Sequence, residues 1–125
     1  MKTENRDMVL IIDDDNRNTF AMQLTLKAKG YKFISSSDAK DGLEILTTNQ
    51  NIGIVLMDMM MPELDGYQAL KIMQSSENYP KVPVIAVTAQ AMSGDRERCI
   101  EAGATEYISK PIDVDILMNI LKKYM

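Results

Sequence analysis

Two uninterrupted apolar runs, each ended by acidic residues, constrain the fold of this chain more than any other feature. One is Met8–Ile12, followed by aspartates at positions 13–15, and the other is Ile54–Met57, followed by Asp58. Short apolar runs without polar alternation are typical of strands buried on both faces of a parallel sheet. In open sheets of that kind, ligands bind beyond the carboxyl ends of the strands. The sequence therefore predicts a group of carboxylates at the ligand-binding edge of a parallel sheet.

Helical and strand patterns alternate along the rest of the chain. Further strands are expected at residues 31–34, 82–87 and 106–109, and helices at about 17–29, after Asp38, from Asp65 to about Ser75, from about Asp95 to Gly103, and from Asp113. Alternation of this kind predicts a parallel sheet with helices on both faces. Right-handed crossovers and this length favour a flavodoxin-like (βα)5 three-layer sandwich, an α/β fold with strand order 2-1-3-4-5.

The spacing of apolar residues predicts which face of each helix packs on the sheet. In the last helix a second apolar stripe lies beside the core stripe, so that it is either covered by neighbouring elements or forms a docking face for a partner or a second copy. The expected inner residues are Phe20, Ala21, Leu24 and Ala28; Ala39, Gly42, Leu43 and Leu46; Ala69, Leu70 and Met73; and Val114, Leu117, Met118 and Leu121, with Ile112, Ile116 and Ile120 as the second stripe.

Composition excludes several classes of function. The chain has no histidine, which excludes a Ser-His triad and histidine metal ligation, and Cys99, its one cysteine, is expected to be a small buried hydrophobe. The net charge of -4 and the lack of a basic stripe argue against binding to nucleic acid. No apolar run approaches the ~20 residues that a membrane-spanning helix needs. The polar segment Met1–Asp7 has no signal-peptide core, so we expect a cytoplasmic protein. The length predicts a single domain over residues 1–125, with no effector domain after Met125.

The expected strand order brings polar side chains from four strand ends to one crevice. Asp13 and Asp14 follow the first strand and Asp58 the third, while Thr88 and Lys110 end the fourth and fifth. Clustered carboxylates raise one another's proton affinity, so a positive charge must offset them. Oxygen ligands without histidine or cysteine favour Mg²⁺, or Ca²⁺ or Mn²⁺, over zinc. A carboxylate nucleophile, a divalent cation, a lysine and a hydroxyl are the groups needed to accept a phosphoryl group.

At these positions the chain resembles the receiver domain of two-component response regulators over nearly its whole length. It is most similar to receivers of hybrid histidine kinases, through Met59–Pro62 and Ala89–Arg96, or to single-domain regulators. The segments that carry the resemblance are Val9–Asp15, Val55–Gly66, Val84–Ala89 and Tyr107–Pro111.

The resemblance implies a phosphoacceptor site with a metal ion. Asp58 would accept a phosphoryl group from a phosphohistidine on a histidine kinase or histidine phosphotransfer domain. Together with Asp58, Asp14 would bind Mg²⁺ directly, Asp13 would bind it mainly through water, and the backbone carbonyl of Met60 would complete the protein ligands. The chain would then be a signalling domain rather than an enzyme with turnover on small substrates.

The resemblance also implies a conformational switch. Thr88 and Lys110 would contact the phosphoryl group, and a cis Lys110–Pro111 bond would aim the lysine. On phosphorylation Thr88 and Tyr107 would turn inward together and reshape the surface of the fourth helix, fifth strand and fifth helix. If the chain forms a homodimer, we expect it to use this same surface, and the downstream partner is unknown.

Each residue also has a simpler interpretation. The acids at 13–15 can cap the first helix, Thr88 can be an ordinary strand residue, Lys110 a surface lysine and Tyr107 a core aromatic. Side chains two positions after the acceptor and after the threonine, Met60 and Gln90, are expected to flank the phosphoryl group. Because Met60 cannot orient a water molecule, we expect its apolar side chain to shield the acyl phosphate in part.

Three rival functions are compatible with parts of the pattern. An aspartyl-phosphate phosphatase of the haloacid dehalogenase class would carry a second acid two residues after the nucleophile, where this chain has Met60. A flavodoxin-like nucleotide binder would carry a glycine-rich or Ser/Thr-rich loop after the first strand, where this chain has three acids. A receiver fold that binds partners without phosphorylation is disfavoured by the complete set of acids.

Overall fold

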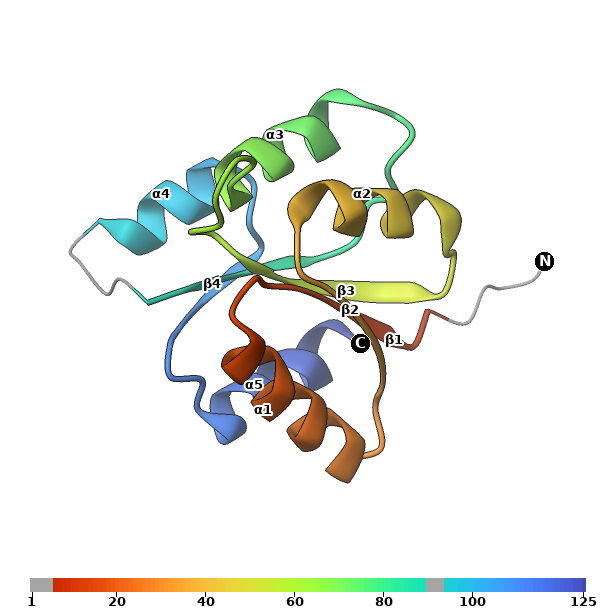
Figure 1. Cartoon of the computed structure of the whole chain (residues 1–125), viewed down its shortest axis with the longest axis vertical. Coiled ribbons are helices and arrows are strands. Elements are labelled where there is room, and N and C mark those ends of the chain that lie inside the picture. The colour runs from red at the N-terminus through yellow and green to blue at the C-terminus, as the bar shows by residue number, and fades with distance from the viewer. Residues whose placement is uncertain (1–5, 90–93) are drawn as a thin grey trace.

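Strands and helices alternate throughout residues 6–89 and 94–125, the parts of the chain described by this computed structural model (Figure 1). None of the helices within these ranges has the length and hydropathy of a membrane-spanning segment. The elements are β1 (Met8–Ile12), α1 (Asn16–Ala28), β2 (Lys32–Ser36), α2 (Ala39–Thr48), β3 (Ile52–Asp58), α3 (Gly66–Ser75), β4 (Val84–Thr88), α4 (Asp95–Glu101), β5 (Glu106–Ser109) and α5 (Val114–Tyr124).

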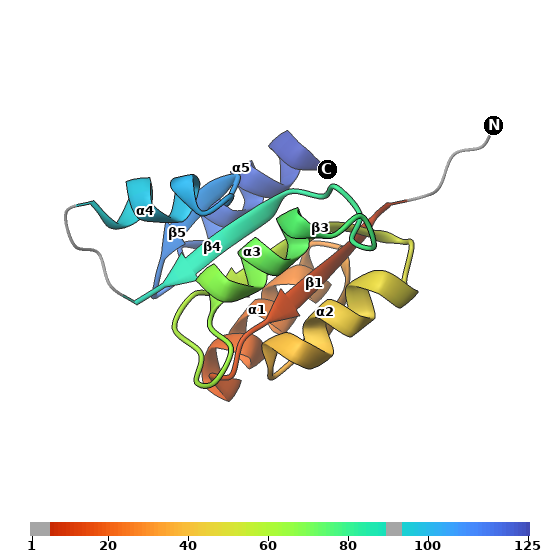
Figure 2. The same cartoon turned by 90° about the horizontal axis from the view of Figure 1, so that it is seen from above.

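The sheet is entirely parallel, with the order β2-β1-β3-β4-β5, and the predicted flavodoxin-like fold is confirmed. Helices α2, α3 and α4 cover one face, and α1 and α5 cover the other (Figures 1 and 2). Each face has its own core, because successive residues of a strand point to opposite sides. Leu10 and Met57 contribute to the core under α2 and α3, whereas Ile11 and Leu56 contribute to the core under α1 and α5.

Two strands begin later than the sequence predicts, and local hydrogen bonds explain both shifts. Tyr31 was expected to start β2, but its N–H donates to the carbonyl of Leu26 at 2.9 Å and so closes the end of α1 after the left-handed Gly30 (φ 83°). Pro83 was expected inside β4, but it has no N–H to donate to a ladder. Its carbonyl accepts from Val55 at 2.9 Å, and regular pairing starts with the next residue.

The predicted inner face of α1 is wrong. Phe20 and Leu24 are 61% and 55% exposed, and the two alanines assigned to that face, Ala21 and Ala28, are exposed as well. The buried residues of α1 are instead Met22 and Leu26. Both pairs have the i, i+4 spacing of a helical stripe, so periodicity alone could not distinguish them. The face that is buried depends on hydrogen bonds from the first turn of the helix to Asp13, the residue after β1.

The other helix faces follow the sequence more closely. The inner residues expected for α2 and α3 are all buried, and so is Cys99 in α4. In α5, Leu117, Met118 and Leu121 are buried as expected, but Val114 is 41% exposed. The second α5 stripe is divided, because Ile120 belongs to the core and Ile116 is 50% exposed. Ile112, before the helix, packs partly against the same core.

We predict that Gly66→Ala destabilises the protein. Gly66 begins α3, and a Cβ placed there would lie 2.7 Å from the Cα of Met59 and 3.0 Å from the carbonyl oxygen of Asp58. Because backbone must shift to make room, we expect a loss of about 1–3 kcal/mol in the free energy of unfolding, measured by urea denaturation. Lys71→Ala, at an exposed site of the same helix, is the control and should change the free energy by less than about 0.5 kcal/mol. Equal stability of the two variants would contradict the packing argument.

Candidate metal centre

The register of the sheet places the acids of β1 and β3 side by side. Ile12 is paired with Met57, so the next residues along each strand, Asp13 and Asp58, are neighbours at the carboxyl edge. The N–H of Asp13 donates to the carbonyl of Ser36 in β2 at 3.0 Å, which extends the ladder to the acid itself. The predicted meeting of these two aspartates is therefore a direct result of strand pairing.

The same register brings Thr88 and Lys110 to this edge. Asp58 is paired with Val87, so Thr88 lies one residue beyond it on β4, where its side chain is buried. Lys110 follows β5, and its N–H donates to the carbonyl of Thr88 at 2.8 Å. The Lys110–Pro111 peptide bond is cis, as the family resemblance implies.

Asp13, Asp14 and Asp58 form an acidic cluster. One carboxylate oxygen of each lies within 4.8 Å of one from each of the others. Asp13 and Asp58 are only 2% and 3% exposed, whereas Asp14 is exposed and could bind a ligand from the solvent side. A set of carboxylates with access on one side fits a hard divalent cation such as Mg²⁺, which binds one or two carboxylates and keeps several waters.

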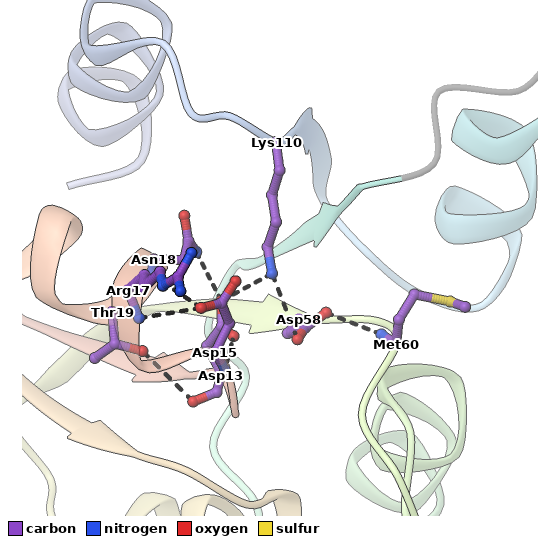
Figure 3. A network of polar contacts seen from close by, with 8 residues as sticks. All are labelled: Asp13, Asp15, Arg17, Asn18, Thr19, Asp58, Met60 and Lys110. Carbon is purple, nitrogen blue, oxygen red and sulfur yellow. Dashed lines mark hydrogen bonds and ion pairs between the residues drawn. The ribbon is translucent and has the colours of Figure 1, made fainter.

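Lys110 is the cation that balances the two buried acids. Its Nζ lies 3.3 Å from Oδ2 of Asp13 and 3.6 Å from Oδ2 of Asp58, and the lysine side chain is only 16% exposed (Figure 3). Burying a carboxylate costs several kcal/mol unless a partner and hydrogen bonds compensate it. One lysine shared between two carboxylates leaves the centre with a net negative charge, which favours the binding of a cation.

The electrostatics of the centre are most visible at Asp58. The pKa of the Asp58 carboxyl is raised from its ordinary value of 3.8 to about 6, and burial is the largest cause. The charge of Asp13 also raises this pKa, while the N–H of Met60, which donates to Oδ1 of Asp58 at 2.9 Å, and the charge of Lys110 lower it. At neutral pH the carboxylate is thus mostly ionised, yet more basic than an ordinary aspartate.

Asn18 is a member of the centre that sequence reasoning missed. Its Nδ2 donates to Oδ2 of Asp13 at 2.7 Å, and the hydroxyl of the next residue, Thr19, donates to the Asp13 carbonyl at 3.5 Å (Figure 3). These contacts turn the face of α1 that carries Met22 and Leu26 toward the sheet. The signal in the sequence was an amide side chain in the first turn of a helix that follows three acids.

The remaining candidate residues are placed unevenly. The side chain of Met60 is 52% exposed and extends away from the Asp58 carboxylate, so the shielding expected of it does not occur in this conformation (Figure 3). Tyr107 is partly buried and packs against the core under α2 and α3. Gln90, expected to flank the phosphoryl group, lies outside the described residues.

Comparisons with known proteins agree with this geometry. A family model of the response regulator receiver domain matches residues 9–122. The polar-differentiation response regulator DivK of Brucella ovis is 35% identical over 117 residues, which make up 94% of this chain and 94% of that protein. These two matches cover nearly all of the chain, and the family model includes the carboxyl ends of all five strands.

Two solved structures share the fold. The receiver domain of sensor histidine kinase PA1611 from Pseudomonas aeruginosa is 33% identical with a TM-score of 0.83, covering 94% of this chain and 96% of that one, and it holds a magnesium ion in its active site cleft. The second is the co-crystal structure of the Saccharomyces cerevisiae histidine phosphotransfer protein Ypd1 with the receiver domain of Ssk1. The match has a TM-score of 0.84 at 19% identity and covers 98% of this chain and 91% of that one. At that identity the second match shows the fold alone.

We predict that Asp58→Asn stabilises the metal-free protein in a pH-dependent way. The pKa of Asp58 is higher in the native state than in the unfolded chain, so the native state binds more protons between about pH 4 and pH 6. The wild type therefore loses this stability as pH rises through that window, and the asparagine variant does not. The expected gain in the free energy of unfolding at neutral pH is on the order of 1–3 kcal/mol, since a pKa shift of one unit is worth about 1.4 kcal/mol.

Urea denaturation in EDTA at several pH values measures the effect. The difference in unfolding free energy between Asp58→Asn and wild type should grow from pH 4 to pH 7, because all other groups titrate in both proteins. A difference that does not vary with pH would contradict a raised Asp58 pKa.

Proposed function

The chain belongs to the response regulator receiver domain family, and we propose that its Asp58 accepts a phosphoryl group in a two-component phosphorelay. The observation that carries the proposal is the buried Asp58 carboxylate at a strand end, beside Asp13 and within 3.6 Å of Lys110. A pKa of about 6 in the metal-free protein leaves the Asp58 carboxylate mostly ionised at neutral pH, as a nucleophile must be. The family match over residues 9–122 supports a single receiver domain as the unit that carries this function.

In the proposed reaction an oxygen of Asp58 attacks phosphorus in line with the bond that joins it to a donor histidine. The new oxygen–phosphorus bond forms as the phosphorus–nitrogen bond breaks, and its electron pair returns to the imidazole nitrogen. Lys110, whose Nζ lies 3.6 Å from Oδ2 of Asp58, would pair with an equatorial oxygen of the transferred group. Thr88, which is buried one residue beyond the partner of Asp58 in β4, would donate its hydroxyl to another of these oxygens.

We propose that Mg²⁺ is held by Asp14, Asp58 and the backbone carbonyl of Met60, with Asp13 acting through water. Asp14 is exposed, and its carboxylate forms no hydrogen bond or ion pair with other residues in the described ranges, so it can bind an ion at little cost. Both oxygens of Asp13 already accept hydrogen bonds, which favours an indirect role for it. When bound, the metal ion neutralises charge on the phosphoryl oxygens.

The proposed donor is a histidine kinase or a histidine phosphotransfer domain, and α1 is its docking surface. Phe20 and Leu24 are exposed apolar residues of α1, and a cavity of about 180 Å³ beside the same helix is lined by Met22, Pro111 and Ile112, among others. Pro111 directly follows the lysine of the centre, so a domain seated here would have the acidic cluster within reach. The yeast receiver domain that shares this fold was crystallised with a histidine phosphotransfer protein, which supports a partner of that class.

The proposed output is a change at the surface formed by α4, β5 and α5. Thr88 is buried and Tyr107 is partly buried on the neighbouring strand, so a shift of the threonine toward a phosphoryl group would make room for the aromatic ring. A downstream protein or a second copy would recognise the altered surface. The chain acts as a signalling domain in this proposal, and chemistry is limited to its own phosphorylation and dephosphorylation.

We predict that phosphoramidate or acetyl phosphate with Mg²⁺ adds one phosphoryl group to the wild-type protein. Intact mass spectrometry should show the adduct in the wild type and none in Asp58→Ala, because the other carboxylates are engaged or lack the lysine. Lys110→Ala should reduce the rate of labelling by about 10²–10³-fold, since it removes the protein's cation from the transferred group.

Glu63→Gln is the matched control, because it removes one exposed acid from the loop between β3 and α3 without touching the acidic cluster. It should be labelled at the wild-type rate. Labelling of Asp58→Ala at the wild-type rate would refute Asp58 as the acceptor.

A further inference from the structure

The first turn of α1 is tied to Asp13 through both carboxylate oxygens. The N–H of Asp15, the N-cap residue, donates to Oδ1 of Asp13 at 2.8 Å. The side-chain amide of Asn18, the third residue of the helix, donates to Oδ2 at 2.7 Å. Hydrogen bonds to a charged acceptor are about twice as strong as neutral ones, so these two contacts fix the carboxylate firmly.

Comparison with α3 shows that Asn18 does not make the capping contact that is common for the third residue of a helix. In α3 the third residue, Gln68, accepts from the N–H of the N-cap Asp65 at 2.9 Å and completes a capping box. In α1 the N-cap N–H is taken by Asp13 instead, and Asn18 points its amide donor at the same carboxylate. The side chain of Asn18 therefore serves the acidic cluster rather than the end of its own helix.

The bond from Asn18 determines how Asp13 meets Lys110. Oδ2 of Asp13 accepts from Asn18 and also lies 3.3 Å from Nζ of Lys110, which in turn lies 3.6 Å from Asp58 (Figure 3). With Oδ1 held by the backbone of Asp15, the carboxylate cannot rotate without losing one of its donors. Asn18, Asp13, Lys110 and Asp58 thus form a continuous chain of polar contacts.

We propose that Asn18 is a positioning residue of the phosphorylation site, which acts on Mg²⁺ and on Lys110 by fixing the orientation of the Asp13 carboxylate. The inference rests on the function proposed above. Without the amide of Asn18, Oδ2 of Asp13 loses one of its two partners. That oxygen can then turn toward Asp58 or draw Lys110 away from Asp58. Partners that orient the residues around a metal are commonly worth 10–100-fold in metal affinity.

The test replaces Asn18 by leucine, which has a similar size but no donor. We expect Asn18→Leu to weaken Mg²⁺ binding about tenfold, measured by isothermal titration calorimetry. Labelling by phosphoramidate at saturating Mg²⁺ should also be slower, because Lys110 is no longer held in place. Asn18→Gln, which keeps an amide on a longer side chain, should recover part of the Mg²⁺ affinity.

Asn16→Leu is the matched control, since Asn16 is exposed in the same turn and its side chain makes no hydrogen bond within the described ranges. It should bind Mg²⁺ as the wild type does. If Asn18→Leu loses only unfolding free energy in EDTA and binds Mg²⁺ as tightly as Asn16→Leu, the residue is merely structural and the proposal is wrong. The Mg²⁺ titration does not depend on phosphorylation, so a wild type that binds Mg²⁺ but takes no label would refute the proposed function alone.

Discussion

The contact of Lys110 with two buried aspartates is the interaction on which the rest of the site depends. Asp13 and Asp58 lie side by side because β1 and β3 are paired in parallel, and burial raises the pKa of the Asp58 carboxyl. Lys110 follows β5, which is paired with β4, and its ammonium group stabilises the negative charge of the two buried carboxylates. The ion pairs with Lys110 offset part of the cost of burying the two carboxylates, and the remaining negative charge favours the binding of a metal ion.

Secondary structure and chemistry are coupled at the start of α1. A helix needs acceptors for its first N–H groups, and the helix after β1 uses the acid of the site as one of them. The same turn supplies the Asn18 amide, so the packing of α1 on the sheet and the orientation of Asp13 depend on the same residues. This coupling explains why the helix buries Met22 and Leu26 and leaves Phe20 and Leu24 exposed.

The sequence allowed the topology and most of the centre to be predicted, because apolar runs, strand ends and turn residues are local signals. The meeting of Asp58 with Lys110 followed from strand order alone. The face of α1 did not, since Phe20–Leu24 and Met22–Leu26 have the same spacing, and what distinguishes them is the contact of the first turn with Asp13, the residue after β1. Asn18 was missed for the same reason: its role depends on a side-chain hydrogen bond across five residues, which has no periodic pattern.

A crystal structure of the protein with Mg²⁺ tests the central claim most directly. The account predicts one ion at the carboxyl edge of the sheet, bound by oxygens of Asp14 and Asp58, with Asp13 still held by Asn18 and reaching the ion through water. Lys110 should remain within ion-pair distance of Asp58. An ion bound elsewhere, or a Lys110 side chain turned away into solvent, would contradict the account.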